Sequence, residues 1–211
     1  MRVGIVDYGL GNLFNVARAL DACGAESFIS DQPSELTEAV ALVLPGVGAF
    51  GEGMANLQRR ELAPMVKNAA AAGTPILGIC LGMQLLFDES EEFGVHAGLG
   101  LIPGRVVRFD EPEGTKSFKI PQIGWNRISG AQSWKGTVLH DVETESFMYF
   151  VHSFYVATAE DNDCLATTSY GRNQFCAVAS RGKVSGCQFH PEKSGEEGLQ
   201  IIRNFIDQAR A

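Results

Sequence analysis

Residues 74–84 compress a strand, a sharp turn and a helix into the short segment TPILGICLGMQ. An apolar run that is too short for a buried helix ends at Cys80, and apolar residues at helical spacing follow at once. Gly78 and Gly82 flank the cysteine as in the G-x-S-x-G turn, which presents a nucleophile between a strand and a helix. Glycines are needed there because the turn strains the backbone and larger side chains would collide across it. The segment therefore predicts a strand–turn–helix unit with a thiol at the turn.

The thiol of Cys80 is expected at the N-terminus of the helix that follows. Free N–H groups and the helix dipole stabilise negative charge at such a place, so the thiolate is favoured. The amide of Leu81 is placed to donate a hydrogen bond to an oxyanion. A buried structural cysteine is the ordinary alternative. The two glycines and the change from strand to helix favour a nucleophile.

Composition limits the class of protein. The chain has 211 residues, of which 45% are hydrophobic and 20% charged, as expected for one globular domain with a full core. A net charge of −8 without any basic block argues against a nucleic-acid partner. No apolar run is long enough for a membrane span, and Arg2 leads into an expected strand rather than a signal peptide. The five scattered cysteines include no C-x-x-C pair, so we expect no disulfide framework and no metal site, and a cytoplasmic location.

The hydrophobic pattern predicts an α/β fold. In the first half we expect strands at 2–7, 26–30, 40–44 and 74–80, and helices at 13–24, 34–39 (capped by Ser34), 51–59 and 61–72. This alternation implies a parallel sheet with helices on both faces. Beyond Gly98 we expect short strands at 106–109, 148–151, 164–168, 175–180 and 184–189, and a helix at 195–209. The prediction is a single domain, 1–211, with a mostly parallel central sheet and an antiparallel or mixed C-terminal part.

A thiol nucleophile needs a base, and His190 has the most suitable context. It follows the strand expected at 184–189, and Pro191 keeps the chain extended at His190. Period-two alternation then puts His190 and Glu192 on the same side of the chain. A carboxylate there can bind one imidazole nitrogen and leave the other to face a thiol. Cys80, His190 and Glu192 would form a triad of nucleophile, base and orienting acid.

The other histidines have ordinary explanations. His96 and His140 lie in polar, loop-like sequence and are expected to be exposed to solvent. His152 lies in a strand expected over 149–154, where a hydrogen-bonded histidine is the usual case.

A glycine-rich loop at 46–51, GVGAFG, matches the dinucleotide fingerprint G-x-G-x-x-G. However, it follows an internal strand, begins after Pro45, and has alanines at 69–72 where an acidic residue should bind the ribose. A second loop, Gly9-Leu10-Gly11, lacks the third glycine. Backbone amides of such loops can also point at an anion, and here that anion would be the oxyanion of an acyl intermediate at Cys80. We therefore expect no cofactor.

Together these residues resemble a known family. The segments that carry the resemblance are spread over nearly the whole chain: 7–13 (DYGLGNL), 45–51 (PGVGAFG), 78–87 (GICLGMQLLF), 124–126 (GWN), 149–153 (YFVHS) and 189–194 (FHPEKS). They look like those of the class I glutamine amidotransferases, and within them most like the glutaminase subunits of imidazole glycerol phosphate synthases. One departure is Gln122, where many of these subunits have a histidine near the expected partner interface.

The resemblance implies a chemistry for each matched position. Cys80 would attack the side-chain amide of glutamine, His190 would shuttle protons and Glu192 would orient it. The amides of Leu81 and of Val47 or Gly48 would form the oxyanion hole. The glutamine pocket would be formed by Gly48, Gln84, Glu92 and the backbone of His152, Ser153 and Phe154. Gln84 and Glu92 would hold the α-amino and α-carboxylate ends of glutamine, although both also fit as ordinary polar residues near a helix end.

The ammonia released needs an acceptor, and nothing in the chain resembles a P-loop or a synthetase domain. The resemblance implies a heterodimer with a separate (β/α)8-barrel cyclase, which receives ammonia and forms imidazole glycerol phosphate and an aminoimidazole carboxamide ribonucleotide. Transfer must be sheltered from water because ammonium is not a nucleophile. Asn12, Trp125, Asn126 and Lys193 would lie at the interface, and Trp125 is equally suited to a core position.

Three alternatives remain open at this point. A similar amidotransferase subunit could supply ammonia in a cell-surface sugar pathway. The chain could be a catalytically silent regulatory or binding module, although an intact triad argues against this. A cysteine peptidase or glyoxalase-like enzyme could share the turn, but such enzymes lack the equivalent of Gln84 and the full His-Pro-Glu motif.

Overall fold

The computed structural model describes residues 1–110 and 118–210. The helices of this part are α1 (Leu13–Ala22), α2 (Pro33–Leu36), α3 (Phe50–Arg59), α4 (Leu62–Ala71), α5 (Leu81–Leu85) and α6 (Gly195–Arg210), with short 3-10 helices at Asp161–Asp163 and Pro191–Lys193. The first strands are β1 (Arg2–Val6), β2 (Glu26–Ser30), β3 (Ala41–Gly46), β4 (Ile76–Cys80), β5 (Glu89–Ser90), β6 (His96–Ala97) and β7 (Gly104–Arg108). They are followed by β8 (Gln122–Arg127), β9 (Ser129–Gly130), β10 (Phe147–His152), β11 (Phe154–Thr158), β12 (Cys164–Tyr170), β13 (Asn173–Arg181) and β14 (Val184–Cys187).

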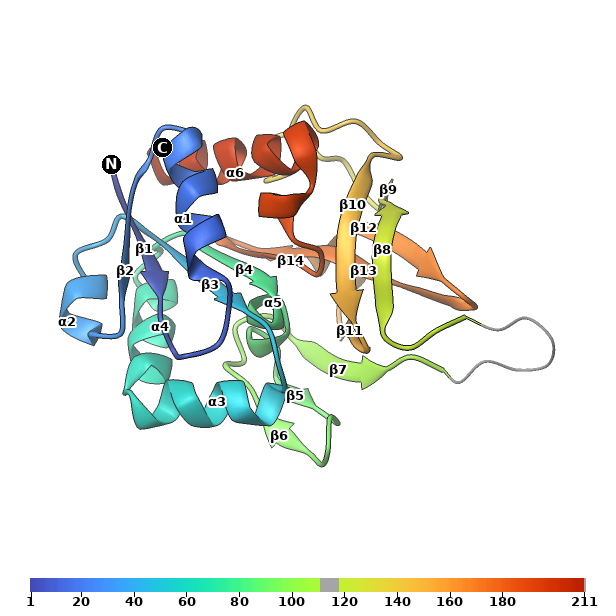
Figure 1. Cartoon of the computed structure of the whole chain (residues 1–211), viewed down its shortest axis with the longest axis horizontal. Helices are drawn as coiled ribbons and strands as arrows, with labels where there is room; N and C mark the ends of the chain where they lie inside the picture. Colours follow the sequence, from blue (N-terminus) through green and yellow to red (C-terminus); the bar gives the residue numbers. More distant parts are fainter. Residues whose placement is uncertain (111–117, 211) are drawn as a thin grey trace.

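The described strands form one large sheet and one small ribbon (Figure 1). The large sheet has twelve strands in the order β2-β1-β3-β4-β14-β13-β11-β7-β5-β6, with β12 and β9 attached through β13. Every pairing from β2 through β14 in this order is parallel, whereas β13, β11 and β7 continue the sheet antiparallel. The ribbon is an antiparallel pair of β8 and β10. The predicted α/β class, with a mostly parallel sheet and a mixed C-terminal part, is therefore confirmed.

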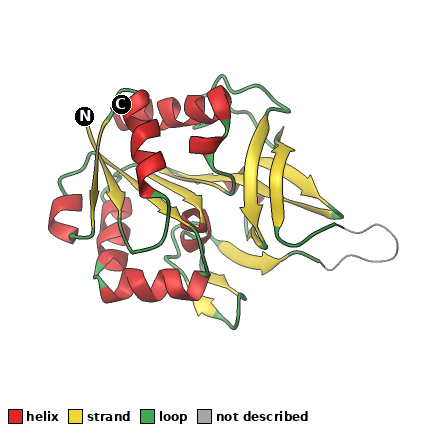
Figure 2. Cartoon of the chain, in the orientation of Figure 1, coloured by secondary structure: helices red, strands yellow, loops and turns green. Residues whose placement is uncertain are grey.

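Helices cover both faces of the parallel strands. Along β3, Ala41 and Val43 belong to the core that includes α1 and α6, while Leu42 and Leu44 belong to the core that includes α3, α4 and α5. This strict alternation is what a strand buried on both sides requires. Figure 2 shows the helices gathered around this half of the molecule, and the antiparallel strands extending beyond them.

The predicted elements differ from the observed ones in a few places. The prediction of Ser34 as a helix cap is wrong: Pro33 begins α2, and no side chain caps its start. Pro suits the first turn because its missing N–H has no partner there in any helix. The strand expected over 149–154 is two strands, β10 and β11, interrupted at Ser153. The expectation for His96 is also wrong, because it lies half-buried in β6, against Gly51, whereas His140 is exposed as predicted.

Strand β8 (Gln122–Arg127) was not predicted from the sequence.

None of the described helices combines the length and the hydropathy that a membrane span needs.

Candidate active site

Cys80 occupies a strained turn between β4 and α5. Its backbone has φ 55° and ψ −111°, a conformation that costs free energy for any residue except glycine. A Cβ atom at Gly78 would lie 2.7 Å from the amide nitrogen of Met83, and one at Gly82 would overlap the carbonyl oxygen of Leu44. The two glycines therefore let the turn pack tightly, and the predicted strand–turn–helix unit is confirmed.

Three neighbouring parallel strands bring the candidate groups together. Gly46, at the end of β3, pairs in register with Cys80 at the end of β4, so the loop that begins at Val47 lies beside the thiol. On the other side of β4, Cys187 of β14 pairs with Ile79, and the chain continues to His190. The carboxyl ends of adjacent parallel strands are where α/β proteins bind their ligands.

His190 and Glu192 form a buried pair. Nδ1 of His190 lies 2.9 Å from Oε1 of Glu192, and their side chains are 5% and 1% exposed. Burial lowers the pKa of His190, but its interactions with Cys80 and then with Glu192 outweigh burial and raise the pKa to about 9. Nε2 of His190 is buried and has no hydrogen-bond partner among the described residues. That nitrogen is thus the one left to exchange a proton with a neighbour.

In this resting arrangement the thiol of Cys80 donates to a backbone carbonyl rather than to the imidazole. Its Sγ lies 3.7 Å from the carbonyl oxygen of Val151. Gln188, which the sequence pattern did not single out, places its amide nitrogen 4.0 Å from the same sulfur. Contacts of a catalytic thiol are often loose without substrate and tighten once it is bound.

A cavity of about 250 Å³ opens at the thiol. Every residue that the resemblance assigned to the oxyanion hole or to the glutamine pocket lines it: Val47, Gly48, Leu81, Gln84, Glu92, His152, Ser153 and Phe154, together with Cys80, Pro121 and Val151. Its size suits a small metabolite rather than a peptide. Gly48 has φ +116°, which side chains rarely adopt, so this loop position requires glycine.

Gln84 uses its amide nitrogen within the protein. Nε2 donates to the carbonyl oxygen of Phe154 at 2.9 Å and to Oε1 of Gln188 at 3.1 Å. Because both N–H groups are engaged, the carbonyl oxygen is the group that Gln84 can offer to a ligand. Gln84 is therefore suited to bind a donor such as an ammonium group.

Glu92 has a structural contact as well as a place in the cavity wall. Its Oε2 accepts a hydrogen bond from the amide of Phe50 at 2.6 Å. Phe50 is the first residue of α3, so the carboxylate satisfies a free N–H group where the helix dipole is positive. This contact ties Glu92 to the helix that follows the Val47–Gly48 loop.

His152 is neutral in the fold. Nδ1 lies 2.8 Å from the carbonyl oxygen of Phe154, which requires the proton on that nitrogen. Burial is the main cause that lowers the pKa of His152 to about 4. The expectation of a hydrogen-bonded strand histidine is confirmed.

Tyr8 is a further buried group near the thiol. Its ring is fully buried in the turn that follows β1, and a Cβ atom at Gly46 would overlap its hydroxyl. Burial raises the pKa of the phenol, and the charge of Cys80 raises it further. The hydroxyl has no partner among the described residues.

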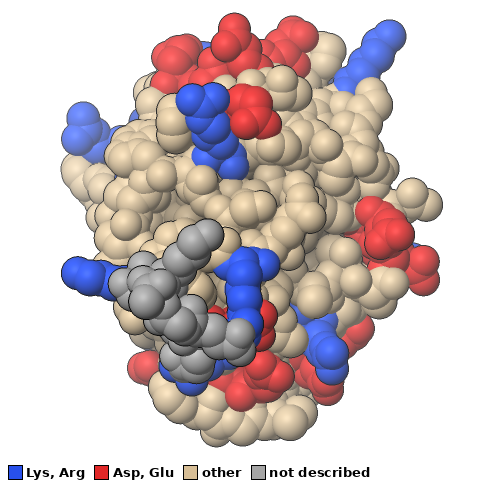
Figure 3. Space-filling model, turned by 90° about the vertical axis from the view of Figure 1, so that its right-hand side faces the viewer, with Lys and Arg blue, Asp and Glu red and all other residues tan. Residues whose placement is uncertain are grey.

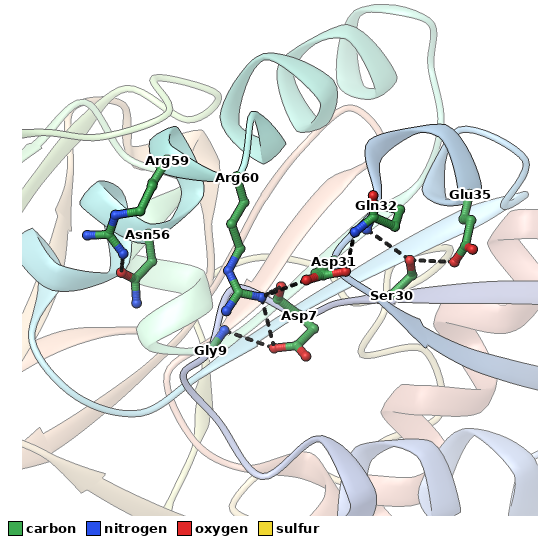
Figure 4. A network of polar contacts seen from close by, with 9 residues as sticks. All are labelled: Asp7, Gly9, Ser30, Asp31, Gln32, Glu35, Asn56, Arg59 and Arg60. Carbon is green, nitrogen blue, oxygen red and sulfur yellow. Dashed lines mark hydrogen bonds and ion pairs between the residues drawn. The ribbon is translucent and has the colours of Figure 1, made fainter.

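The loop that carries Tyr8 is held from outside by Arg60. Its guanidinium donates to the carbonyl oxygen of Asp7 at 3.0 Å and pairs with Asp31 at 3.2 Å, while the Asp7 carboxylate accepts the amide of Gly9 (Figure 4). This network fixes the turn after β1 beside the site.

The residues expected at a partner interface lie in different settings. Asn12 is exposed and accepts the amide of Asn15 at the start of α1. Trp125 is 56% exposed on β8 and contacts the ring of Tyr149, so it is not a core residue. The Nζ atom of Lys193 lies 5.8 Å from that Tyr149 ring. Asn126, in contrast, turns to the other side of β8 and donates to the carbonyl oxygen of Ser169 at 2.7 Å.

Comparisons with known proteins agree with this geometry. The sequence matches the family described as glutamine amidotransferase class-I over residues 4–209. The imidazole glycerol phosphate synthase subunit HisH of Geobacillus sp. (strain WCH70) is 49% identical over 205 residues, which are 96% of this chain and 95% of that protein. The protein of the same description from Bacillus subtilis (strain 168) is 44% identical over 98% of this chain and 96% of its own length. A solved structure described as a glutamine amidotransferase has a TM-score of 0.75 at 18% identity and covers 99% of both chains, which supports the fold alone. The chain belongs to the class I glutamine amidotransferase family, in the branch that contains the HisH subunits.

Proposed function

We propose that this chain hydrolyses glutamine to glutamate and ammonia, and passes the ammonia to a separate (β/α)8-barrel cyclase subunit of an imidazole glycerol phosphate synthase. The observation that carries the proposal is that Cys80, in its strained turn, lines a small cavity and interacts with His190 of the buried His190–Glu192 pair. The names of the relatives described above support the pathway.

The reaction follows from the placement of these groups. The Cys80 thiol transfers its proton to Nε2 of His190, and the thiolate attacks the side-chain carbonyl carbon of glutamine. When the tetrahedral intermediate collapses, the C–N bond breaks, the nitrogen takes the proton from His190, and ammonia leaves a glutamyl thioester. Water then attacks the thioester with His190 as base, and glutamate and the free thiol are released.

Backbone amides are suited to stabilise the oxyanion of both tetrahedral intermediates. Leu81 follows the nucleophile directly, and Val47 and Gly48 line the same cavity from the neighbouring strand. Fixed N–H donors are effective because they need no reorganisation as charge develops on the oxygen. In the pocket, Gln84 would accept from the α-ammonium group of glutamine, since its own N–H groups are already engaged.

The pH dependence tests the role of His190. Interactions with Cys80 and Glu192 raise the pKa of His190 to about 9, above its usual value, so the imidazolium that forms when Cys80 transfers its proton is retained at neutral pH and is lost as the pH rises through that value. We expect kcat/KM for glutamine to fall on this alkaline side. Glu192→Gln should move the fall to lower pH and reduce the maximal rate by about tenfold or more. A pH profile of glutamate release measures both, and an unmoved alkaline limb in Glu192→Gln would contradict the assignment.

The β8–β10 ribbon offers a surface for the cyclase. In register, Trp125 lies opposite Tyr149 and Arg127 opposite Phe147, so these side chains share the outer face of the ribbon, while Phe150 is buried in the core on the other. Aromatic and arginine side chains of this kind are enriched at protein interfaces. Figure 3 views the end of the molecule at which the ribbon lies and shows a wide uncharged area between scattered charged side chains. Strand β10 leads directly into residues that line the cavity, so a partner docked there would lie next to the site of ammonia release.

We expect Trp125→Ala to weaken binding of the cyclase by at least about tenfold, because large aromatic anchors dominate interface free energies. Glutamine hydrolysis by the isolated chain should be unchanged. A matched pair gives the control: Ile123→Ala, at a position 64% exposed on the ribbon, should weaken binding, and Ile29→Ala, 44% exposed on β2, should not. Titration calorimetry measures both effects, and equal affinities for all variants would place the interface elsewhere.

The decisive experiment measures glutamate release by the purified chain alone, then with the cognate barrel cyclase and its nucleotide ligand. A low rate alone and a large rise with the loaded cyclase are expected. A full rate alone, or no response to that cyclase, would keep the glutaminase chemistry and assign the ammonia to a different acceptor. No glutamate under any condition would reject the proposed function.

A further inference from the structure

Gln188 is a fully buried amide beside the nucleophile, at 0% exposure. Its backbone amide donates to the carbonyl oxygen of Ala177 at 2.9 Å, which continues the pairing of β13 and β14 and keeps the segment extended. In an extended chain, residues two apart face the same side, so Gln188 and His190 both turn toward Cys80. A buried amide costs free energy unless its polar atoms are bonded, so its contacts indicate why glutamine stands here.

The polarity of this amide is fixed by a chain of hydrogen bonds. The carbonyl oxygen of Phe154 can only accept, so the atom of Gln84 that lies 2.9 Å from it is the nitrogen. That nitrogen also lies 3.1 Å from the Gln188 side chain, so the Gln188 atom facing it is the oxygen. The Gln188 nitrogen is therefore the atom that lies 4.0 Å from the sulfur of Cys80. The chain thus runs in one direction, from a backbone carbonyl in the cavity wall to the nucleophile.

We propose that Gln188 is a positioning residue that donates its side-chain N–H to the Cys80 sulfur and so stabilises the thiolate, with Gln84 holding the amide in the required orientation. In the resting thiol the proton of Cys80 is directed to the Val151 carbonyl, which leaves a sulfur lone pair for this donor. Once the proton has left for His190, the contact becomes a charge-assisted hydrogen bond, which is stronger and shorter. The Gln188 amide links the pocket to the nucleophile, because Gln84, which lines the cavity, donates to Gln188, and Gln188 lies beside the Cys80 sulfur.

The inference rests on the proposed role of Cys80 as nucleophile, but its test does not need glutamine. Iodoacetamide alkylates thiolates faster than thiols, so the rate of Cys80 alkylation against pH has a midpoint that reports its ionisation. Burial does not distinguish Cys80 from Cys164, Cys176 and Cys187, which are buried as well, and Cys23 is half-buried. The alkylated peptide is therefore identified by mass spectrometry, with Cys80→Ala as the blank.

Two variants separate the contacts of Gln188. Gln188→Glu keeps an oxygen for the Nε2 of Gln84 but replaces the N–H donor beside the sulfur. It should raise the alkylation midpoint by about one pH unit or more and lower kcat about tenfold, with KM within about threefold of the original. Gln188→Met fills a similar volume without polar atoms. It should raise the midpoint less, since it adds no charge, and should also raise KM, because Gln84 loses a partner that orients it.

Asn204→Leu is the control for loss of a buried amide. Asn204 lies on α6 and donates to the carbonyl oxygens of Val138 and His140, away from the cavity wall. It should lower stability without moving the midpoint. A midpoint that stays at its original value in folded Gln188→Glu or Gln188→Met would overturn the proposal, even if hydrolysis fell.

A second measurement uses the unaltered glutamine in case neither variant folds. In the ¹⁵N-labelled chain, one side-chain amide signal should titrate with the alkylation midpoint and should stop titrating in Cys80→Ala. Absence of such a signal would equally overturn the proposal. If the unaltered chain did not hydrolyse glutamine, while the Gln188 variants still shifted the alkylation midpoint of Cys80, the proposed function would be rejected and this inference would stand.

Discussion

Cys80→Ala is expected to reduce glutamine-dependent turnover by about three orders of magnitude or more, while leaving ammonia-dependent synthesis by the cyclase complex intact. The first effect follows because no other described side chain at the cavity can form the thioester, and removing the nucleophile of a catalytic triad costs most of its rate enhancement. The second follows from the division of labour, since added ammonia bypasses the hydrolytic site. His190→Ala should give the same pattern.

The measurement compares product formation by the reconstituted complex with glutamine and with an ammonium salt at a pH where free ammonia is present. Binding of each variant to the cyclase is checked first, so that a lost complex is not taken for lost chemistry. If both activities fell together while the complex stayed intact, the proposed separation of ammonia production from ammonia use would be wrong.

The site residues were predictable where they belong to short sequence motifs. The glycines around Cys80 and the spacing of His190 and Glu192 are local patterns, and the fold brings these segments together because they end adjacent parallel strands. The reason given for the His190–Glu192 pair was wrong, however: only His190 is extended, and Glu192 lies in the 3-10 helix Pro191–Lys193, which brings its carboxylate back to the imidazole. That helices cover both faces of the sheet was also predictable, because the hydrophobic periodicity within each strand and helix indicates which of its sides is buried.

What the sequence did not predict depends on tertiary partners. Gln188 is one polar residue in a strand, and its role follows only from the positions of Gln84 and Cys80, which are more than a hundred residues away in the chain. Glu92 matches a ligand-binding position, yet its contact with the amide of Phe50 depends on where α3 begins. The resemblance placed Asn126 with Trp125 at the partner interface, and that interface stays a prediction; neighbours in a strand point to opposite sides, and the contact of Asn126 with Ser169 of β12 depends on the tertiary fold.

Gly82→Ala is expected to be the most destabilising single methyl addition at the site. The new Cβ atom would overlap the carbonyl oxygen of Leu44, a backbone atom of a central strand that cannot move without disturbing β3 and β4 together. We expect a loss of more than about 4 kcal/mol in the free energy of unfolding, well above the usual effect of one substitution. Gly130→Ala is the matched control, because the nearest atom to its Cβ lies 3.5 Å away, an ordinary contact. Urea unfolding followed by circular dichroism compares the two. If the Gly82→Ala chain were as stable as the Gly130→Ala chain, the turn would relax easily around the added methyl group. The tight packing of α5 against β3 would then not be the cause of the strained backbone conformation of Cys80.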